Sequence, residues 1–438
     1  MERDIFKQLQ YWKKDKKRKP LILTGARQVG KTTLLKQFGK TEYQHTVYVN
    51  FEENHMLQAL FESTLDPTVL INALKIEMNI DITPGNTLLI FDEIQECPTA
   101  LNSLKYFCER ANDYHVTAAG SLLGVKLIHN QGFPVGKVNF LNLYPLSFLE
   151  FLGAMNEKKL RTYIDEIKHI EPLLSNLHER LLQYFRIYLF TGGMPEAVME
   201  YLDSNDLNKV RNIHQEILKA YSLDFAKHVP KGNIMEISMV WDAIPSQLAK
   251  ENKKFIYSLI RKGARAKDFE AAVQWLVEAG LIHKVYHITV PKIPLDAHAN
   301  FDFFKIYLVD VGLLNAMANL SPKAILYGNK LLQEFRGSLV ENYIAQELAC
   351  LHYELYYWTS EGKAELDFII QHEDNVFPLE IKSGNSEKKK SLRVYADKYH
   401  SPLLLRCSAM NLKKDGKIIN FPLYLIGKMK QLLGLDQF

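Results

Sequence analysis

The stretch that decides the fold is GARQVGKT, residues 25–32, which follows the apolar run LILT at residues 21–24. It fits the pattern GxxxxGK followed by Ser or Thr, in which a strand runs into a glycine-containing turn and then into a helix. The glycines let the backbone fold into a nest whose N–H groups face phosphates, and the helix N-terminus adds its positive dipole end. In such a nest Lys31 reaches the β- and γ-phosphates of ATP, and the Thr32 hydroxyl faces Mg²⁺. The stretch therefore predicts a site for ATP and Mg²⁺.

In a second run, LLIFDE at residues 88–93, four apolar residues are followed by two carboxylates. We expect Asp92 to hold Mg²⁺ through its water shell and Glu93 to polarise the attacking water as a general base. Taken alone, this run is explained as well by a buried strand that ends in two solvated acids. The phosphate-binding stretch lies upstream at the expected distance, which favours the nucleotide interpretation.

We therefore predict that ATP contacts the glycine-rich turn, the first turn of the helix after it and the end of a later strand. The predicted ATP-binding residues are Gly25, Ala26, Arg27, Gln28, Val29, Gly30, Lys31, Thr32, Thr33 and Ser121. Ser121 follows the strand-like run at 115–120, where a polar group would meet the γ-phosphate, although a helix N-cap explains it equally well. No arginine lies between Ser121 and Arg161, which argues against a ring-forming motor and leaves the oligomeric state open.

Strand-like runs alternate with helical stretches in the first third of the chain, as in a mostly parallel sheet covered on both faces. The fold class is therefore α/β, with an N-terminal P-loop NTPase parallel sheet, a helical and winged-helix middle and a C-terminal mixed α/β core. The predicted boundaries are 1–155 for the ATPase domain, 156–300 for the helical and winged-helix region and 301–438 for the C-terminal domain. In the last domain a helix at 333–350, three strands, a helix and a strand follow the order of restriction-endonuclease-like nucleases.

Three charged residues interrupt the apolar strands of the C-terminal domain, where an unpaired charge is costly to bury. Asp367 begins one strand, and Glu380 and Lys382 share one face of the next because they are two residues apart. Two carboxylates and a lysine suit Mg²⁺-assisted phosphodiester hydrolysis, with Glu341 on the preceding helix as a further metal ligand. We therefore predict Asp367, Glu380 and Lys382 as catalytic and Glu341, Asp367 and Glu380 as metal ligands. The alternatives are a buried Lys–Asp–Glu cluster that stabilises the sheet, or a nuclease core that no longer cuts.

The composition is that of an ordinary globular protein. The chain has 438 residues and a net charge of +4, which is compatible with nucleic acid without indicating it. Its four cysteines form no CxxC pair, which argues against a disulfide framework. The N-terminus carries charges where a signal peptide needs an apolar run, and no apolar stretch is long enough to span a membrane. We expect a cytoplasmic protein with no membrane segment.

Seven stretches, in one order along nearly the whole chain, resemble a widespread prokaryotic family that joins an AAA-type ATPase domain to a C-terminal domain of unknown function, DUF4143. They are GARQVGKTTLL (25–35), LLIFDEIQ (88–95), AAGSLLG (118–124), YPLSFLEF (144–151), GGMPEAV (192–198), FKIYLVDVGLL (304–314) and ELDFII with PLEIKSG (365–384). The chain is also similar to archaeal ATPases with the same modular order. The resemblance implies ATP binding, a winged-helix middle and a nuclease-like C-terminal core.

These observations predict a Mg²⁺-dependent ATPase whose nucleotide state controls a nucleic-acid-directed C-terminal module. The basic stretch at 253–280 would contact DNA, with its second helix in the major groove, although a basic helix is more often a solvated face. The alternative is a nucleotide-dependent switch that binds a protein partner while the nuclease-like core is inactive.

Overall fold

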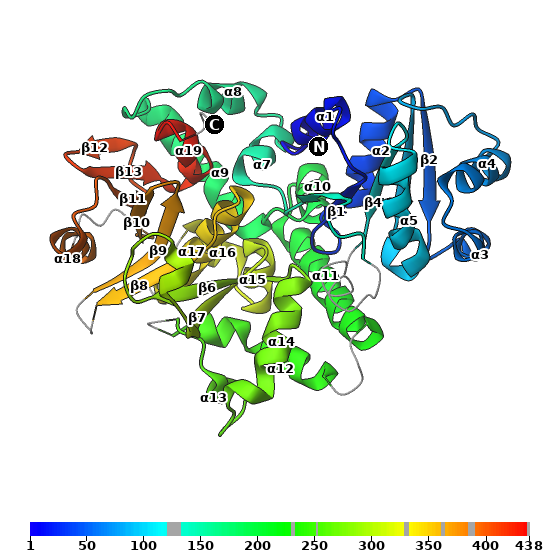
Figure 1. Cartoon of the computed structure of the whole chain (residues 1–438). Coiled ribbons are helices and arrows are strands. Elements are labelled where there is room, and N and C mark those ends of the chain that lie inside the picture. Colours follow the sequence, from blue (N-terminus) through cyan, green and yellow to red (C-terminus); the bar gives the residue numbers. More distant parts are fainter. Residues whose placement is uncertain are drawn as a thin grey trace. The chain divides into compact units, whose positions relative to one another are not determined.

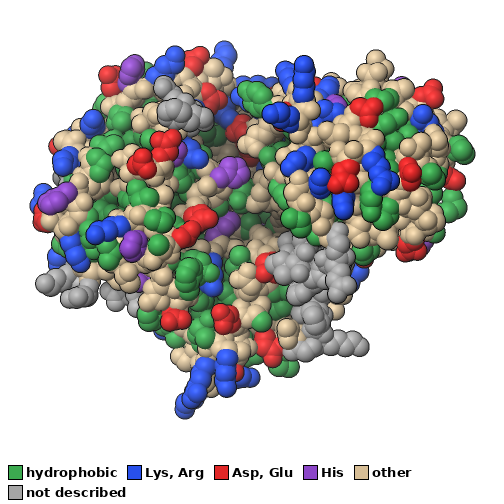
Figure 2. Space-filling model, viewed as in Figure 1, with side chains coloured by type: hydrophobic (Ala, Val, Ile, Leu, Met, Phe, Trp, Pro, Cys, Tyr) green, Lys and Arg blue, Asp and Glu red, His purple; other side chains and the backbone are tan. Residues whose placement is uncertain are grey.

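The computed structural model (Figure 1) describes residues 1–120, 133–228, 233–250, 253–327, 333–360, 364–383 and 390–435. The chain forms two compact units. Unit 1 consists of Met1–Tyr144 with Glu278–Gly280, and unit 2 of Pro145–Val277 with Leu281–Phe438. On the face drawn in Figure 2, basic and acidic side chains are interspersed over both units.

Unit 1 contains a parallel sheet, as the alternation of strands and helices predicted. Within the described residues its strand order is β2-β3-β4-β1-β5, and every neighbouring pair is parallel. The strands are β1 (Leu21–Thr24), β2 (His45–Asn50), β3 (Thr87–Asp92), β4 (His115–Ala119) and β5 (Asn139–Asn142).

Every residue of β3 is buried, so both faces of the sheet are covered at this strand. Its Leu89 and Phe91 join a buried cluster with Phe61, Leu74 and Leu104 from the helices of one face. The helices of unit 1 are α1 (Phe6–Lys14), α2 (Lys31–Glu42), α3 (His55–Ser63), α4 (Pro67–Met78) and α5 (Pro98–Arg110), with the short η1 (Ile94–Glu96). Strands that are buried on both faces are typical of parallel sheets in α/β proteins.

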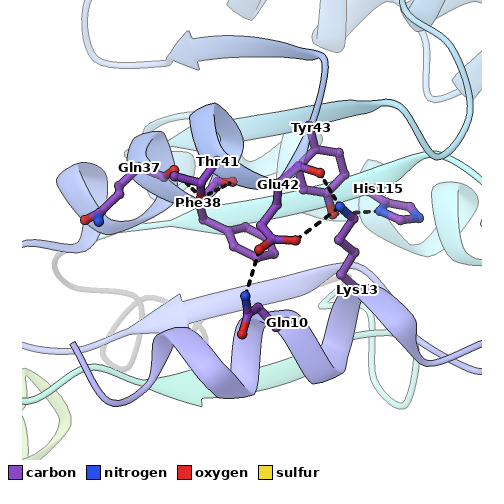
Figure 3. Close-up of polar contacts among 8 residues, drawn as sticks. All are labelled: Gln10, Lys13, Gln37, Phe38, Thr41, Glu42, Tyr43 and His115. Atoms are coloured by element: carbon purple, nitrogen blue, oxygen red, sulfur yellow. Dashed lines mark hydrogen bonds and ion pairs between the residues drawn. The ribbon is translucent and has the colours of Figure 1, made fainter. Parts of the chain in front are cut away.

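The N-terminal helix α1 holds the C-terminal end of α2 (Figure 3). Gln10 donates to the Glu42 carboxylate at 2.7 Å, and the Lys13 ammonium lies 3.3 Å from the other carboxylate oxygen. Beside them the Tyr43 hydroxyl and His115 Nδ1 are 2.7 Å apart. Burial lowers the pKa of His115 to about 4, so its ring is neutral at physiological pH and suited to this bond. Lys13 and Gln10 of α1 therefore help to hold α2 in place.

Unit 2 combines a helical segment with a mixed sheet, which confirms the predicted helical middle and mixed C-terminal part. Among the described residues the sheet order is β12-β13-β11-β10-β9-β8-β6-β7. The strands are β6 (Ile282–Ile288), β7 (Ala299–Leu308), β8 (Tyr356–Ser360), β9 (Ala364–His372), β10 (Asn375–Ile381), β11 (Leu404–Ser408), β12 (Lys413–Asp415) and β13 (Ile418–Pro422).

The helices of unit 2 begin in the middle of the chain and alternate with strands after residue 281. They are α7 (Phe148–Ala154), α8 (Lys158–Asp165), α9 (Ser175–Thr191), α10 (Pro195–Ser204), α11 (Leu207–His228), α12 (Ile234–Leu248), α13 (Tyr257–Ile260), α14 (Ala266–Glu278), α15 (Val311–Met317), α16 (Pro322–Tyr327), α17 (Gln333–Cys350), α18 (Lys390–Tyr399) and α19 (Met429–Leu432). The predicted boundary at residue 300 falls inside β7, so strands from both sides of it share one sheet. The division into three domains stays a prediction.

Helix α17 is buried although several of its side chains are polar. Asn342 accepts from the Leu308 N–H at 2.7 Å and donates to the Leu308 carbonyl at 3.0 Å. The Gln346 side chain accepts from the Val311 N–H at 3.1 Å. One oxygen of Glu347 accepts from the Phe148 N–H at 2.8 Å. A buried N–H or carbonyl without a partner costs free energy, so these side chains complete the backbone hydrogen bonding of α7, β7 and α15.

Asp310 joins two stretches that are far apart in the chain. Its carboxylate accepts from the Gly193 N–H at 2.6 Å, across 117 residues, and from the Leu313 N–H at 3.0 Å. A Cβ on Gly193 would lie 2.1 Å from the Leu146 carbonyl oxygen, so this approach requires glycine. Burial raises the pKa of Asp310 to about 6, against the backbone donors that lower it. The turn between α9 and α10 is thereby fixed to the start of α15.

Replacing Asp310 should destabilise the protein more than replacing an exposed helix cap. The change Asp310→Ala leaves two buried N–H groups without an acceptor, at a cost of about 2–4 kcal/mol in free energy of unfolding. The control Asp66→Ala removes a solvent-exposed N-cap of α4, at a cost of about 1 kcal/mol. Urea unfolding monitored by tryptophan fluorescence compares the two, and equal losses would show that burial of the Asp310 contacts is unimportant.

Candidate nucleotide-binding site

The glycine-rich turn connects β1 to α2, as the sequence predicted. Gly30 is the residue before α2 and has φ 96°, and Gly25 has φ 139°. A Cβ on Gly25 would lie 2.2 Å from the Leu143 carbonyl oxygen, so a residue with a side chain does not fit at this position. Gln28 also has a positive φ, of 65°. The turn has the backbone geometry from which anion-binding nests are built.

Lys31 is buried inside this turn. Its ammonium donates to the carbonyls of Gly25 at 2.9 Å and Ala26 at 2.8 Å. Burial lowers the pKa of Lys31 to about 8, while the nearby Glu93 and Asp92 carboxylates raise it. The side chain therefore remains mainly protonated at neutral pH and places a positive charge within the turn.

Asp92 is buried at the end of β3, where side chains from two other elements meet it. The Thr32 hydroxyl of α2 donates to its Oδ2 at 2.7 Å, and the Tyr48 hydroxyl of β2 donates to the same oxygen at 2.9 Å. Its Oδ1 accepts from the Glu93 N–H at 3.1 Å. The structure thus brings together Thr32 and Asp92, which are 60 residues apart in the chain.

The residues at this point fit Mg²⁺. The Thr32 hydroxyl donates a hydrogen bond to Asp92 and keeps lone pairs that can face a cation. The Asp92 carboxylate can bind through either of its oxygens. Mg²⁺ is a hard cation that takes oxygen ligands and binds proteins through one or two carboxylates together with substrate phosphates. Thr32 and Asp92 would therefore hold Mg²⁺ beside the phosphates.

Glu93 has a backbone conformation that is uncommon for a residue other than glycine. Its φ and ψ are 46° and 43°, in the left-handed region, and its side chain accepts a hydrogen bond from Gln95. Strained backbone of this kind is concentrated at functional sites, where the surrounding structure holds it. The conformation sets the direction of the carboxylate that we predict as the general base.

Two residues at this site were not found from the sequence. Tyr48 shares the α2 side of the sheet with Ile90, its register partner in β3, and the Lys36 ammonium of α2 lies 3.6 Å from the centre of its ring. Gln95 follows the two carboxylates. Alternation along β2 was the available signal for Tyr48, because it separates this residue from the buried Val47 and Val49.

The other predicted ATP-binding residues lie around the turn or outside the described residues. Val29 is buried and its carbonyl accepts from Arg3 at 3.0 Å. Thr33, on the first turn of α2, is exposed. Ser121 is outside the described residues, so its predicted contact with the γ-phosphate stays a prediction.

In unit 2, lysines pair with the carboxylates of the predicted metal site. Glu341 pairs with Lys253, and Glu380 lies 3.0 Å from Lys382. Asp367 instead accepts from the Ile381 N–H at 2.7 Å. Burial, together with the nearby Glu341 carboxylate, raises the pKa of Asp367 to about 7.

No three His, Cys, Asp or Glu residues are arranged to hold a metal ion within the described part of the chain. One feature remains in favour of a ligand: Oε2 of Glu380 is buried without a hydrogen-bond partner. The metal and catalytic roles of Glu341, Asp367, Glu380 and Lys382 stay predictions.

Comparisons with known families divide the chain into three matched segments. Residues 17–152 match a family described as an AAA domain. The chain carries an AAA-type P-loop ATPase domain. Residues 182–324 and 336–426 match two families described as domains of unknown function, DUF8612 and DUF4143. The DUF4143 match agrees with the resemblance drawn from the sequence, and DUF8612 adds a family for the middle segment.

Individual relatives of this chain are distant. An uncharacterized protein of Methanocaldococcus jannaschii is 25% identical over 257 residues, and the match covers 52% of this chain and 52% of that protein. The chain thus spans about half the length of the curated relative it matches. Among solved structures, a Walker-type ATPase of Pyrococcus abyssi has a TM-score of 0.44 at 15% identity and covers 72% of this chain and 94% of its own. The Orc1 protein of Aeropyrum pernix, solved in complex with DNA, has a TM-score of 0.30 at 12% identity and covers 72% and 90%.

Across the ranges that the structure describes, no helix has both the length and the apolar character needed to cross a membrane.

The change Tyr48→Phe should weaken the use of Mg²⁺ by the ATPase domain while the aromatic ring stays over Lys36. Loss of one donor to Asp92 is worth about 1 kcal/mol, so we expect about a fivefold higher Mg²⁺ concentration at half-maximal ATP turnover. Binding of a fluorescent ADP analogue in EDTA should be unchanged. Tyr11→Phe, at an exposed tyrosine of α1, is the control. An unaltered Mg²⁺ requirement in Tyr48→Phe would contradict a role in positioning Asp92.

Proposed function

We propose that this chain hydrolyses ATP with Mg²⁺ and that the nucleotide state of unit 1 controls a nucleic-acid-directed, nuclease-like module in unit 2. The observation that most directly supports hydrolysis is the 2.7 Å contact between Thr32 and Asp92. The buried Lys31 ammonium lies within the same turn, beside the carbonyls of Gly25 and Ala26. The AAA-domain match over residues 17–152 supports the same activity.

Each residue of the site has a chemical role in this proposal. The backbone N–H groups of the turn bind the phosphates, and Lys31 moves from the carbonyls of Gly25 and Ala26 to the β- and γ-phosphates. Thr32 and Asp92 hold Mg²⁺, which neutralises charge on the phosphate oxygens when it is bound. Glu93 orients a water molecule and accepts its proton as the water attacks the γ-phosphorus.

The nucleic-acid half of the proposal is supported by the order of elements in unit 2. Helices α12, α13 and α14 precede an antiparallel pair of strands, β6 and β7, which is the order of a winged helix. The short connection between α13 and α14 contains basic side chains that are exposed to solvent. They are Arg261, Lys262 and Arg265, and the exposed Lys267 follows on α14. Exposed cations on a DNA-binding fold bind phosphates without reading sequence.

ATP turnover by the full chain, with and without duplex DNA, tests both halves of this proposal. We expect Lys31→Ala and Glu93→Gln each to lower turnover by about 100-fold or more, since each removes a group that acts in the transition state. Glu93→Gln should still bind ATP. DNA should stimulate the wild type, and it should stimulate neither of the two variants.

The matched control is Lys40→Ala, at an exposed lysine on the same helix as Lys31. Turnover that survives Lys31→Ala would contradict the assigned site. Turnover by the wild type that is indifferent to DNA would instead favour control by a protein partner.

A second candidate is a nucleotide-dependent switch that binds a protein partner while the nuclease-like core is inactive. The observation in its favour is that lysines pair with the carboxylates of that core. Lys253 pairs with Glu341, and Lys382 with Glu380. At each of these carboxylates the ammonium competes with a metal ion for one oxygen, Oε1.

Cleavage of supercoiled plasmid in Mg²⁺ or Mn²⁺ separates an active core from an inactive one. The lysine pairs lead us to expect no more nicking by the wild type than by Glu380→Gln. Glu373→Gln, at an exposed turn between β9 and β10, is the matched control. Metal-dependent nicking that is lost in Glu380→Gln and retained in Glu373→Gln would show instead that the core cuts DNA.

A further inference from the structure

The antiparallel pair β6–β7 contains a bulge that exposes two phenylalanines. The register runs regularly up to the pair Tyr286–Phe304 and then continues at the pair His287–Asn300. Residues 301–303 of β7 therefore have no partner in β6. Phe301 is 59% exposed and Phe303 is 39% exposed. Bulges redirect side chains, and this one presents two aromatic rings to solvent.

Lysines lie against the rings at this bulge. The Lys254 ammonium is 3.2 Å from the centre of the Phe303 ring. The Lys284 ammonium is 4.7 Å from the Tyr286 ring and 4.3 Å from the Phe304 ring. Such cation–π contacts hold a positive charge beside an aromatic face. One exposed ring of the bulge, that of Phe303, therefore has a cation against it. Lys284 places a second cation beside the bulge, against Tyr286 and the buried Phe304.

The basic connection between α13 and α14 belongs to the same region of unit 2. The Phe255 N–H donates to the Phe304 carbonyl at 2.8 Å, which places the chain before α13 beside β7. The Tyr257 and Phe304 ring centres are 6.4 Å apart. Figure 2 shows Lys and Arg side chains gathered at the lower end of the view, over α13. Asp302 is the acidic residue of the bulge itself, and it is exposed.

We propose that this surface, made of the bulge 301–303 with Lys254 and Lys284, binds single-stranded nucleic acid. Bases would stack on Phe301 and Phe303, and phosphates would lie against the lysines. A single strand fits better than a duplex because stacking on a side chain needs the face of a base, and paired bases present their edges. The cations at the rings favour a polyanion over an apolar peptide. This inference rests on the nucleic-acid half of the proposed function and adds the class of ligand and the residues that bind it.

Fluorescence anisotropy with a labelled oligothymidine of about 15 nucleotides tests the proposal on the full chain. Phe301→Ala and Phe303→Ala should each weaken binding by about fivefold or more, since each removes a stacked base. Because their phosphate contacts remain, the salt dependence of binding should be unchanged. Lys254→Ala and Lys284→Ala should each reduce the slope of log K against log salt by about 0.7.

Asp302→Asn supplies a test in the opposite direction, because removing the acid of the bulge should strengthen binding. The substitution removes a negative charge that repels phosphates and leaves the two phenylalanine rings unchanged. Two matched controls should bind like the wild type: Phe140→Ala, at a half-exposed phenylalanine of β5, and Lys398→Ala, at an exposed lysine whose ammonium lies 5.2 Å from the Tyr399 ring.

The outcomes separate this inference from the proposed function. If duplex DNA stimulates ATP turnover while Phe301→Ala and Phe303→Ala bind the oligothymidine as tightly as the wild type, the surface is assigned wrongly and the proposed function stands. If the wild type binds neither oligothymidine nor duplex, this inference and the nucleic-acid half of the proposed function both fail. If the wild type binds no oligothymidine and Phe301→Ala abolishes a self-association seen by size-exclusion chromatography, the surface is an interface for a second copy of this chain.

Discussion

The carboxylate of Asp92 is the point on which the nucleotide site depends. One of its oxygens accepts from hydroxyls on α2 and β2, and the other accepts from the backbone at the end of β3. Three elements are therefore positioned against one side chain. Because Asp92 is buried, losing these donors would cost free energy, so the three elements are held in this arrangement. The strand, the P-loop helix and the neighbouring strand meet in one geometry, and the turn that holds Lys31 follows from it.

In unit 2, buried polar side chains likewise hold separate elements together, here by hydrogen bonds to backbone N–H groups. Asp310, Asn342 and Glu347 each accept from a buried N–H of a distant segment. This explains why stretches such as 192–198 and 304–314 are distinctive without carrying evident chemistry. The Gly193 N–H needs an acceptor and leaves no room for a side chain, and Asp310 supplies that acceptor. These stretches of sequence are therefore explained by the contacts that hold distant segments of the fold together.

Local patterns in the sequence predicted the elements well and the long-range partners poorly. The glycine-rich turn, the apolar strand before Asp92 and the helix at 333–350 were recognisable because each depends on a spacing within a few residues. The contact of Tyr48 with Asp92 and the pairing of Lys253 with Glu341 join residues 44 and 88 positions apart. No short spacing encodes such a contact. The charged residues of the C-terminal strands were identified correctly as unusual, but the lysine that neutralises Glu341 was not.

The two units treat their carboxylates differently, and this difference decides which function is better supported. Asp92 accepts its hydrogen bonds from neutral hydroxyl and N–H donors, which fix its position. Glu341 and Glu380 each have one oxygen paired with an ammonium group, which offsets their charge. A carboxylate that is held in place and still charged attracts a divalent cation, whereas one that is already paired must first lose its partner. Hydrolysis of ATP therefore requires little rearrangement of Asp92, and metal-dependent cleavage by unit 2 would require its lysines to move.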